Sequence, residues 1–190
     1  MKIGIYGGSF NPIHNGHIAL ARQMLRNLPL DEVWMMVSPQ NPLKQSDSDL
    51  LDDRKRWEMT EAALRDEEKL KACALEFNLP KPSYTWRTLQ ALSSEHPDDR
   101  FTLIIGADNW QLFPRWYHSD DILRHYSIAI YPRTGFPVSV ADLPEGVTLV
   151  NTELYDISST DIRRRIRQGR PYEHLIPKAI HRLAQKYYGA

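Results

Sequence analysis

The feature that most constrains this chain is a glycine-rich turn between an apolar segment and an amphipathic one near the N-terminus. Residues 2–6 have the apolar character of a short buried parallel strand, and the chain then passes through Gly7 and Gly8 before a helical pattern begins. Adjacent glycines carry no Cβ, so the backbone there can approach a ligand closely. The sequence therefore predicts a strand, a ligand-binding turn and a helix, in that order.

The polar residues of this turn indicate that the ligand is a phosphate. We expect a helix over residues 16–28 with Asn15 as its N-cap. His17 then lies in the first turn, where free N–H groups and the positive end of the helix dipole favour an anion. His14 precedes it by three residues, so both imidazoles can face the same phosphate.

The spacing of the glycines and histidines excludes the two commonest phosphate-binding loops. It also argues against a plain turn and against a zinc site. The glycines do not follow the G-x-G-x-x-G pattern, and the chain contains no Gly-Lys pair of the kind a Walker loop requires. A plain turn with a chance pair of histidines would not require so dense a motif. A zinc site is not expected either, because H-x-x-H lacks the i, i+4 spacing and the nearby glutamate of a zinc helix.

Alternating apolar and amphipathic segments predict an α/β fold with a doubly wound, mostly parallel sheet of five or six strands. The length fits a single domain, residues 1–190, with a C-terminal helical part from about 157 to 190 packed on it. We expect the strands at residues 2–6, 33–37, 70–77, 101–105, 126–131 and 147–150. Helices are expected at residues 16–28, 52–65, 83–95, 119–124 and 177–188, with a further helix after Ser158. Ser83 is the expected N-cap of the third of these helices.

Composition limits the partners and the compartment. The 24 basic residues balance the 24 acidic ones, so no net charge favours a nucleic acid, and the arginines of residues 163–170 lack a stacking platform. No apolar stretch is long enough to span a membrane. Cys73 is the single cysteine, which favours a reducing cytoplasm. The oligomeric state stays open, with a homo-oligomer as one option.

Further candidate groups follow the predicted strands, at the edge of a parallel sheet where ligands bind. Asp108 comes directly after the fourth strand and suits a ribose hydroxyl pair or a helix cap. Arg133 follows the fifth strand. Lys44 lies in a long loop after the second strand, where a phosphate contact and an ordinary solvated lysine are equally supported.

The segment after the sixth predicted strand has the features of a second anion site. Ser158 as N-cap and Asp161 three residues later form an acidic variant of the capping box. The hydroxyls of residues 158–160 and the free N–H groups at this helix start can bind an anion, and Arg163 falls on the first turn. A capped surface helix with a basic face is the simpler alternative.

Four motifs resemble those of the nicotinate-nucleotide adenylyltransferases, a family of the H-x-G-H nucleotidyltransferase superfamily. They are G-G-S-F-N-P-I-H-N-G-H from Gly7, S-Y-T-W-R-T-L from Ser83, I-I-G-A-D-N-W from Ile104 with Trp116 behind it, and I-S-S-T-D-I-R from Ile157. The resemblance covers nearly the whole chain. It implies a Rossmann-like fold and an enzyme of NAD biosynthesis that transfers the adenylyl group of ATP to nicotinate mononucleotide.

The resemblance also implies a role for each residue of the motifs. ATP would be held by Gly7, Gly8, Ser9, Phe10, Gly106, Asp108, Ile157, Ser158, Ser159 and Thr160. Contacts to the reacting phosphates would come from His14, His17, Lys44 and Arg163, and the pyridine substrate would be bound by Tyr84, Thr85, Trp116 and Arg133. Mg²⁺ would be held mainly through the phosphates of ATP, without a protein metal site.

One position departs from the family pattern, and two alternatives accompany the family assignment. Family members often read P-P-H-K or P-P-H-R after the second strand, whereas Leu43 stands at the histidine position here. A related transferase would act on nicotinamide mononucleotide, phosphopantetheine or a sugar-alcohol phosphate. A non-catalytic nucleotide-binding sensor would bind ATP without releasing pyrophosphate.

Overall fold

The computed structural model describes residues 1–39 and 49–189, and in this part of the chain six strands form one sheet. The strands are β1 (Lys2–Gly8), β2 (Glu32–Val37), β3 (Leu70–Cys73), β4 (Arg100–Gly106), β5 (Ser127–Tyr131) and β6 (Val147–Leu149). Their spatial order is β3-β2-β1-β4-β5-β6, and every neighbouring pair is parallel. The predicted doubly wound parallel sheet is confirmed.

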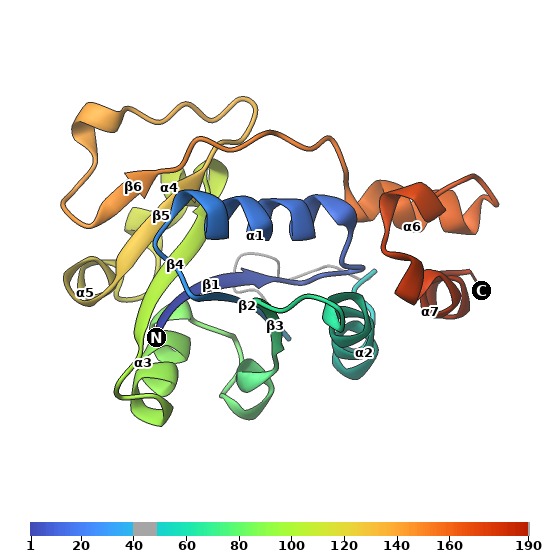
Figure 1. Ribbon diagram of the computed structural model, residues 1–190, viewed down its shortest axis with the longest axis horizontal. Helices are drawn as coiled ribbons and strands as arrows, with labels where there is room; N and C mark the ends of the chain where they lie inside the picture. Colours follow the sequence, from blue (N-terminus) through green and yellow to red (C-terminus); the bar gives the residue numbers. More distant parts are fainter. Residues whose placement is uncertain (40–48, 190) are drawn as a thin grey trace.

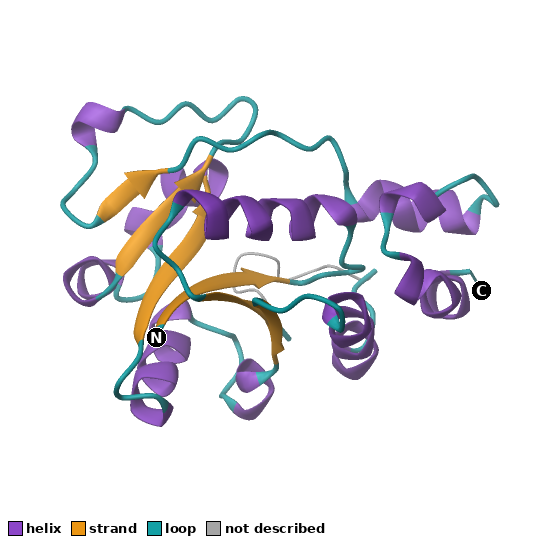
Figure 2. Cartoon of the chain, in the orientation of Figure 1, coloured by secondary structure: helices purple, strands orange, loops and turns teal. Residues whose placement is uncertain are grey.

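Helices cover both faces of this sheet, with α1 on one side and α3 on the other (Figures 1 and 2). The helices are α1 (Asn15–Asn27), α2 (Asp53–Leu64), α3 (Thr85–Glu95), α4 (Ala107–Leu112), α5 (Ser119–His125), α6 (Ser159–Arg167) and α7 (His181–Tyr188). Short 3₁₀ turns occupy Leu75–Asn78, Phe113–Arg115, Val140–Asp142, Glu173–Leu175 and Lys178–Ile180. Among the helices of the described residues, none combines the length and apolar character that crossing a membrane requires.

The buried apolar residues form one cluster on each side of the sheet. Ile18 and Met24 of α1 pack in the first cluster with Met59 of α2, and Leu89 and Leu92 of α3 pack in the second. Strands β1 and β4 are neighbours in space although two strands, β2 and β3, separate them in the sequence. The strand order reverses there, and parallel sheets of this kind bind ligands at such a reversal, beyond the carboxyl ends of the strands.

The C-terminal helices pack on the first cluster and contact the glycine-rich turn. Ile162 of α6 and Ala184 of α7 are fully buried in that cluster. The hydroxyl of Tyr188 donates to the Asn11 side-chain oxygen at 2.7 Å. The C-terminal part therefore supports the turn directly.

Several local predictions were wrong. His14, not Asn15, is the N-cap of α1, and Asn15 instead donates its side-chain amide to the carbonyl oxygen of His174. The third strand ends at Cys73 rather than Phe77, because the chain turns so that the Glu76 side chain reaches hydroxyl partners in the interior. The last predicted helix begins only at His181, after a 3₁₀ turn.

Candidate active site

The two histidines of the glycine-rich turn hold each other in place at the start of α1. The Nδ1 atom of His14 accepts the backbone N–H of His17 at 3.3 Å, and the Nδ1 atom of His17 accepts that of His14 at 3.2 Å. Their rings stack, with 3.6 Å between centroids. A ring nitrogen that accepts a hydrogen bond carries no proton, so each neutral ring carries its proton on Nε2.

His14 stays neutral at physiological pH. Burial, and next the nearby positive charge of Arg133, lower the pKa of His14 to about 4. A neutral imidazole with its Nε2–H is a hydrogen-bond donor, so His14 acts on an anion by donation rather than by net charge.

Both histidines line a large cavity of about 930 Å³ beyond the ends of β1 and β5. This volume lies within the range of roughly 300–1,000 Å³ usual for ligand sites. Arg133 supplies a half-exposed cation to its wall. Another part of the wall is the segment of residues 153–160, which leads into α6. Histidines, an arginine and a helix N-terminus around one cavity suit a polyphosphate.

The hydroxyls at the start of α6 have structural partners of their own. The Ser158 hydroxyl accepts the backbone N–H of Asp161 at 3.4 Å, which confirms the predicted cap. The Ser159 hydroxyl donates to the Pro12 carbonyl oxygen at 2.8 Å and so ties α6 to the glycine-rich turn. Thr160 is exposed on the cavity wall.

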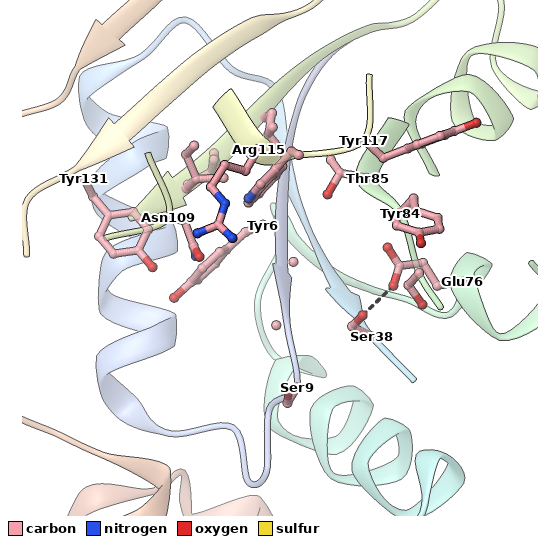
Figure 3. A pocket seen from close by; sticks show the side chains of 17 residues that line it. Tyr6, Ser9, Ser38, Glu76, Tyr84, Thr85, Asn109, Arg115, Tyr117 and Tyr131 are labelled. Atoms are coloured by element: carbon pink, nitrogen blue, oxygen red, sulfur yellow. Dashed lines mark hydrogen bonds between the residues drawn. The ribbon is translucent and has the colours of Figure 1, made fainter. Parts of the chain in front are cut away.

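A smaller cavity of about 250 Å³ adjoins the large one. Tyr6 and Tyr131 line both cavities, with their ring centroids 6.0 Å apart in an edge-to-face arrangement, and burial raises the pKa of both phenols. The small cavity lies below the size range of whole drug-sized ligands, so it fits a single ring rather than a nucleotide. Its walls include the Trp116 indole and the turn before α3 (Figure 3).

The start of α3, at the wall of the small cavity, has free hydrogen-bond donors. Within the described part of the chain, no N-cap side chain accepts a hydrogen bond from this helix, whereas side chains cap α1 and α6. Its first N–H groups therefore lack side-chain acceptors. Ser83, predicted to be the cap, points its buried hydroxyl elsewhere, and Tyr84 holds the N-cap position.

Two buried donors of the small cavity make no well-formed hydrogen bond among residues 1–39 and 49–189. They are the indole Nε1–H of Trp116 and the hydroxyl of Ser83, which lies near enough to the Glu76 carboxyl group to oppose the rise of its pKa. Buried polar groups are nearly always paired, so such donors indicate a ligand that brings acceptors. A planar ring bearing an acceptor-rich group fits this environment.

A carboxyl group also lines the small cavity. Glu76 is 7 % exposed, and its two oxygens accept hydrogen bonds from the hydroxyls of Ser38 at 2.7 Å and Thr88 at 2.8 Å. Burial raises the pKa of Glu76, and these hydroxyl donors oppose the shift. On the other side of the same cavity, Arg115 and Asn109 lie next to Tyr6 (Figure 3).

The glycine and the acid after β4 lie against Arg133 rather than on a cavity wall. An Oδ1 atom of Asp108 lies 3.5 Å from Nε of Arg133. A Cβ at Gly106 would come within 2.4 Å of that Asp108 oxygen, so a larger residue would displace the acid. Asp108 thus orients a cation of the large cavity.

The structure brings most of the predicted site residues to these two cavities. The large one is lined by His14, His17, Arg133, Ile157, Ser158, Ser159 and Thr160, and the small one by Gly7, Gly8, Ser9, Tyr84, Thr85 and Trp116. Lys44, like Leu43, lies outside the described residues. Their individual roles in binding stay predictions.

Phe10 and Arg163 are placed differently from the sequence-based expectation. The Phe10 side chain is 2 % exposed and packs under Gly8 in the core. Arg163 is 5 % exposed and lines neither cavity, because its guanidinium donates to the Asp49 carboxylate at 2.9 Å and the Asn11 carbonyl oxygen at 2.8 Å. In this conformation Arg163 braces the glycine-rich turn.

Sequence patterns missed the polar residues that complete the small cavity, namely Ser38, Glu76, Ser83, Asn109, Arg115 and Tyr117. Ser83 was assigned to a cap, and Glu76 to a strand. Two signals could have drawn attention to this set: Asn109 lies within the recognised motif that starts at Ile104, and Arg115 directly precedes Trp116.

Comparisons with known proteins agree with this geometry. The family model described as cytidylyltransferase-like matches residues 5–165. A probable nicotinate-nucleotide adenylyltransferase from Bacteroides thetaiotaomicron is 43% identical over 187 residues, covering 98% of this chain and 92% of the relative. One of the same name from Cytophaga hutchinsonii is 43% identical over 190 residues, covering 99% and 98%.

Solved structures share the fold. The Plasmodium falciparum nicotinic acid mononucleotide adenylyltransferase complexed with NaAD superposes with a TM-score of 0.75 at 20% identity, over 98% of this chain and 93% of that one. The same enzyme complexed with APC gives a TM-score of 0.73 over the same shares. At this identity the likeness establishes the fold alone.

Proposed function

The chain belongs to the nicotinate-nucleotide adenylyltransferases, and we propose that its two adjoining cavities bind ATP and nicotinate mononucleotide for adenylyl transfer. The products are nicotinate adenine dinucleotide and pyrophosphate. The observation that carries the proposal is the pairing of a phosphate-type cavity with a ring-sized one across a shared wall, Tyr6 and Tyr131. A dinucleotide-forming enzyme needs two such sites in contact.

ATP occupies the large cavity in this proposal. Its triphosphate accepts hydrogen bonds from His14 and His17 and lies near the N-terminus of α6, with Arg133 as the cation on the opposite wall. Both rings donate through Nε2, and the bonds between their Nδ1 atoms and the backbone keep them oriented before the substrate arrives. Catalysis then consists of alignment and of stabilising charge on the α-phosphate and the leaving pyrophosphate.

The mononucleotide places its pyridine ring in the small cavity. The ring stacks on Trp116, and the ring carboxylate accepts hydrogen bonds from the uncapped N–H groups of α3 and from the Ser83 hydroxyl. Its phosphate then reaches past Tyr6 and Tyr131 toward the α-phosphate of ATP. This phosphate is an anion at neutral pH and attacks in line without a general base. The new P–O bond forms as the bond to pyrophosphate breaks.

Mg²⁺ accompanies the nucleotide in this proposal. The large cavity offers two carboxylates, Glu153 and Asp156, together with imidazole and hydroxyl groups. Among residues 1–39 and 49–189, no three metal-binding side chains are grouped together. This donor set fits an ion held mainly by phosphate oxygens and water, as Mg²⁺ prefers. Bound there, the ion supplies charge neutralisation at the phosphates.

A pyrophosphate-release assay with ATP and each candidate acceptor tests the proposal. We expect rapid release with nicotinate mononucleotide and slower release with nicotinamide mononucleotide, because the unpartnered donors around the ring favour an acceptor-only group. Equal or faster release with nicotinamide mononucleotide or phosphopantetheine would assign the chain to a related transferase. ATP binding without release from any acceptor would indicate a sensor.

A further inference from the structure

The small cavity presents an electrostatic conflict that neither the motifs nor the family assignment addresses. Under the proposed function it receives the carboxylate of nicotinate mononucleotide, yet the Glu76 carboxyl group already lines its wall. Two negative charges in a cavity of about 250 Å³ repel each other strongly, since little water is present to screen them. The site needs a means to relieve this repulsion.

Among the described residues, no cation is in direct contact with the Glu76 carboxyl group. Its oxygens are bonded to hydroxyls from two elements, Ser38 at the end of β2 and Thr88 on α3. Arg56 of α2 donates to the Ser38 carbonyl oxygen at 2.9 Å, and its other bonds go to Leu51, Ser9 and Asp53 rather than to Glu76. The Cys73 thiol, whose pKa is raised by burial and also by Glu76, is the titratable group nearest along the chain.

Arg115, the cation of this cavity, lies on the opposite side. Figure 3 shows Glu76 beside Ser38 and Tyr84, whereas the Arg115 guanidinium lies toward Tyr6 and Tyr131. The carboxyl group of Glu76 is therefore held by neutral donors, which can also accept a hydrogen bond from its protonated form.

We propose that Glu76 binds a proton from solvent when nicotinate mononucleotide enters the small cavity, so that the bound substrate and Glu76 together carry one carboxylate charge instead of two. The inference rests on the proposed function. The reaction is the addition of one proton to the Glu76 carboxylate, with no other bond changed. The amide substrate, which carries no such charge, binds without this proton.

This coupling makes substrate preference depend on pH in a defined direction. Above the pKa of Glu76 in the free enzyme, Glu76 is mostly ionised and must take up a proton when nicotinate mononucleotide binds. The affinity for nicotinate mononucleotide therefore falls as the pH rises. Uptake of one proton can raise the dissociation constant of nicotinate mononucleotide by at most about tenfold per pH unit. This pH dependence ends above the pKa of Glu76 in the complex. The Glu76 pKa is already raised by burial, which brings the effect toward neutral pH.

The test measures the dissociation constants of the acid and amide mononucleotides from pH 6.5 to pH 9, in the absence of ATP. Both ligands carry the same phosphate and ribose, so the ratio of their dissociation constants cancels the titration of the phosphate. In the wild-type enzyme we expect this ratio, acid over amide, to rise by at least about fivefold across the range. Calorimetry in two buffers of different ionisation enthalpy should show greater proton uptake for the acid.

Variants identify the group. In Glu76→Gln, which keeps the shape and an acceptor for Ser38 or Thr88, the ratio should be constant with pH, whereas Glu61→Gln on the exposed face of α2 should behave as the wild type. The calorimetric comparison needs only the wild-type protein, so a poorly folded variant leaves the inference testable. A flat ratio and equal proton uptake in the wild type would overturn the inference while leaving the proposed function intact. Failure to bind either mononucleotide would refute the proposed function itself.

Discussion

The two cavities of this protein are built by opposite means. The large one takes its histidines and its hydroxyls from two contiguous segments, each at the start of a helix, and its groups are already bonded to the backbone around them. The small one gathers residues from separate elements, and two of its buried donors make no well-formed hydrogen bond within the described residues. The first is preorganised for phosphate, and the second is completed by its ligand.

This difference implies separate roles for the two cavities: the large one supports the reaction, and the small one selects the acceptor. Phosphate chemistry is common to every adenylyl acceptor, so a preformed donor set serves it without regard to the acceptor. Discrimination among acceptors requires buried groups that only the correct ligand satisfies, because an unpaired buried donor penalises the wrong one. Damage to the large cavity should therefore lower turnover, and damage to the small one should change affinity and preference.

Removing a histidine from the large cavity should have the largest effect. In His17→Ala the phosphate loses a donor and the N–H of His14 loses its acceptor, so we expect turnover to fall by about a hundredfold or more. The Michaelis constant for the mononucleotide should hardly change. Steady-state kinetics with pyrophosphate detection measure both, and His96→Ala, at a half-buried position that lines neither cavity, serves as the control. Near-normal turnover of His17→Ala would exclude the ring from catalysis.

The next largest effect should come from a residue that supports the glycine-rich turn and the wall of the small cavity. Arg56 is fully buried and donates to the carbonyl oxygens of Ser9 at 2.5 Å and Ser38 at 2.9 Å. It is also paired with Asp53 at 2.6 Å. Arg56→Met leaves these acceptors unpaired and should lower the free energy of unfolding by about 2–4 kcal/mol.

Chemical denaturation measures that loss, with Arg54→Met on the exposed side of α2 as the matched control. Arg56→Lys should recover less than half of it, because one ammonium group cannot replace the planar fork of donors. Unchanged stability in Arg56→Met would mean that the two carbonyl oxygens find other donors.

A smaller effect is expected at Ser83, where the two interpretations of the residue predict different outcomes. As a ligand donor, its loss in Ser83→Ala should raise the Michaelis constant for nicotinate mononucleotide by about tenfold and leave that for ATP unchanged. A helix cap would instead cost about 1 kcal/mol of stability. Kinetics and thermal unfolding together decide, with Ser94→Ala on the same helix as the control. Lost stability of Ser83→Ala with an unchanged Michaelis constant would show that Ser83 acts as a helix cap rather than as a ligand donor.

The same contrast explains how much could be predicted from the sequence. The order of strands and helices and the phosphate-binding segments were predictable because apolar periodicity and contiguous motifs are local signals. The cap at Ser158 was found for that reason. The cap at the first helix was missed, because histidine is not among the usual capping residues and its role depends on the partner ring of His17.

The small cavity was only half predictable. Trp116 and the Tyr84-Thr85 turn came from motifs, but Glu76 resembles any surface acid in the sequence, and its burial depends on hydroxyls from two distant elements. Arg163 shows the converse. Its position after a capped helix start suggested an anion contact, yet Asp49 and Asn11 hold its guanidinium in the structure. Tertiary partners decide such cases.

The smallest effect is expected at Gln23, and it tests how much of the wall of the large cavity is held in place before the nucleotide binds. Gln23 of α1 is 4 % exposed, and its side-chain oxygen accepts the backbone N–H of Glu153 at 2.7 Å while its amide donates to the Tyr155 hydroxyl at 3.3 Å. Both partners belong to the cavity wall that leads into α6. Gln23→Leu should therefore raise the Michaelis constant for ATP about two- to threefold without affecting the mononucleotide.

Hydrogen exchange at the Glu153 amide gives a second measure of this contact, because exchange should become faster when the acceptor is lost. Gln90→Leu, on the exposed face of α3, controls for the change in polarity. Faster exchange with an unchanged constant for ATP would show that the segment of residues 153–160 adapts to the nucleotide. In that case the large cavity, like the small one, would be completed by its ligand, and preorganisation would be confined to the histidine pair.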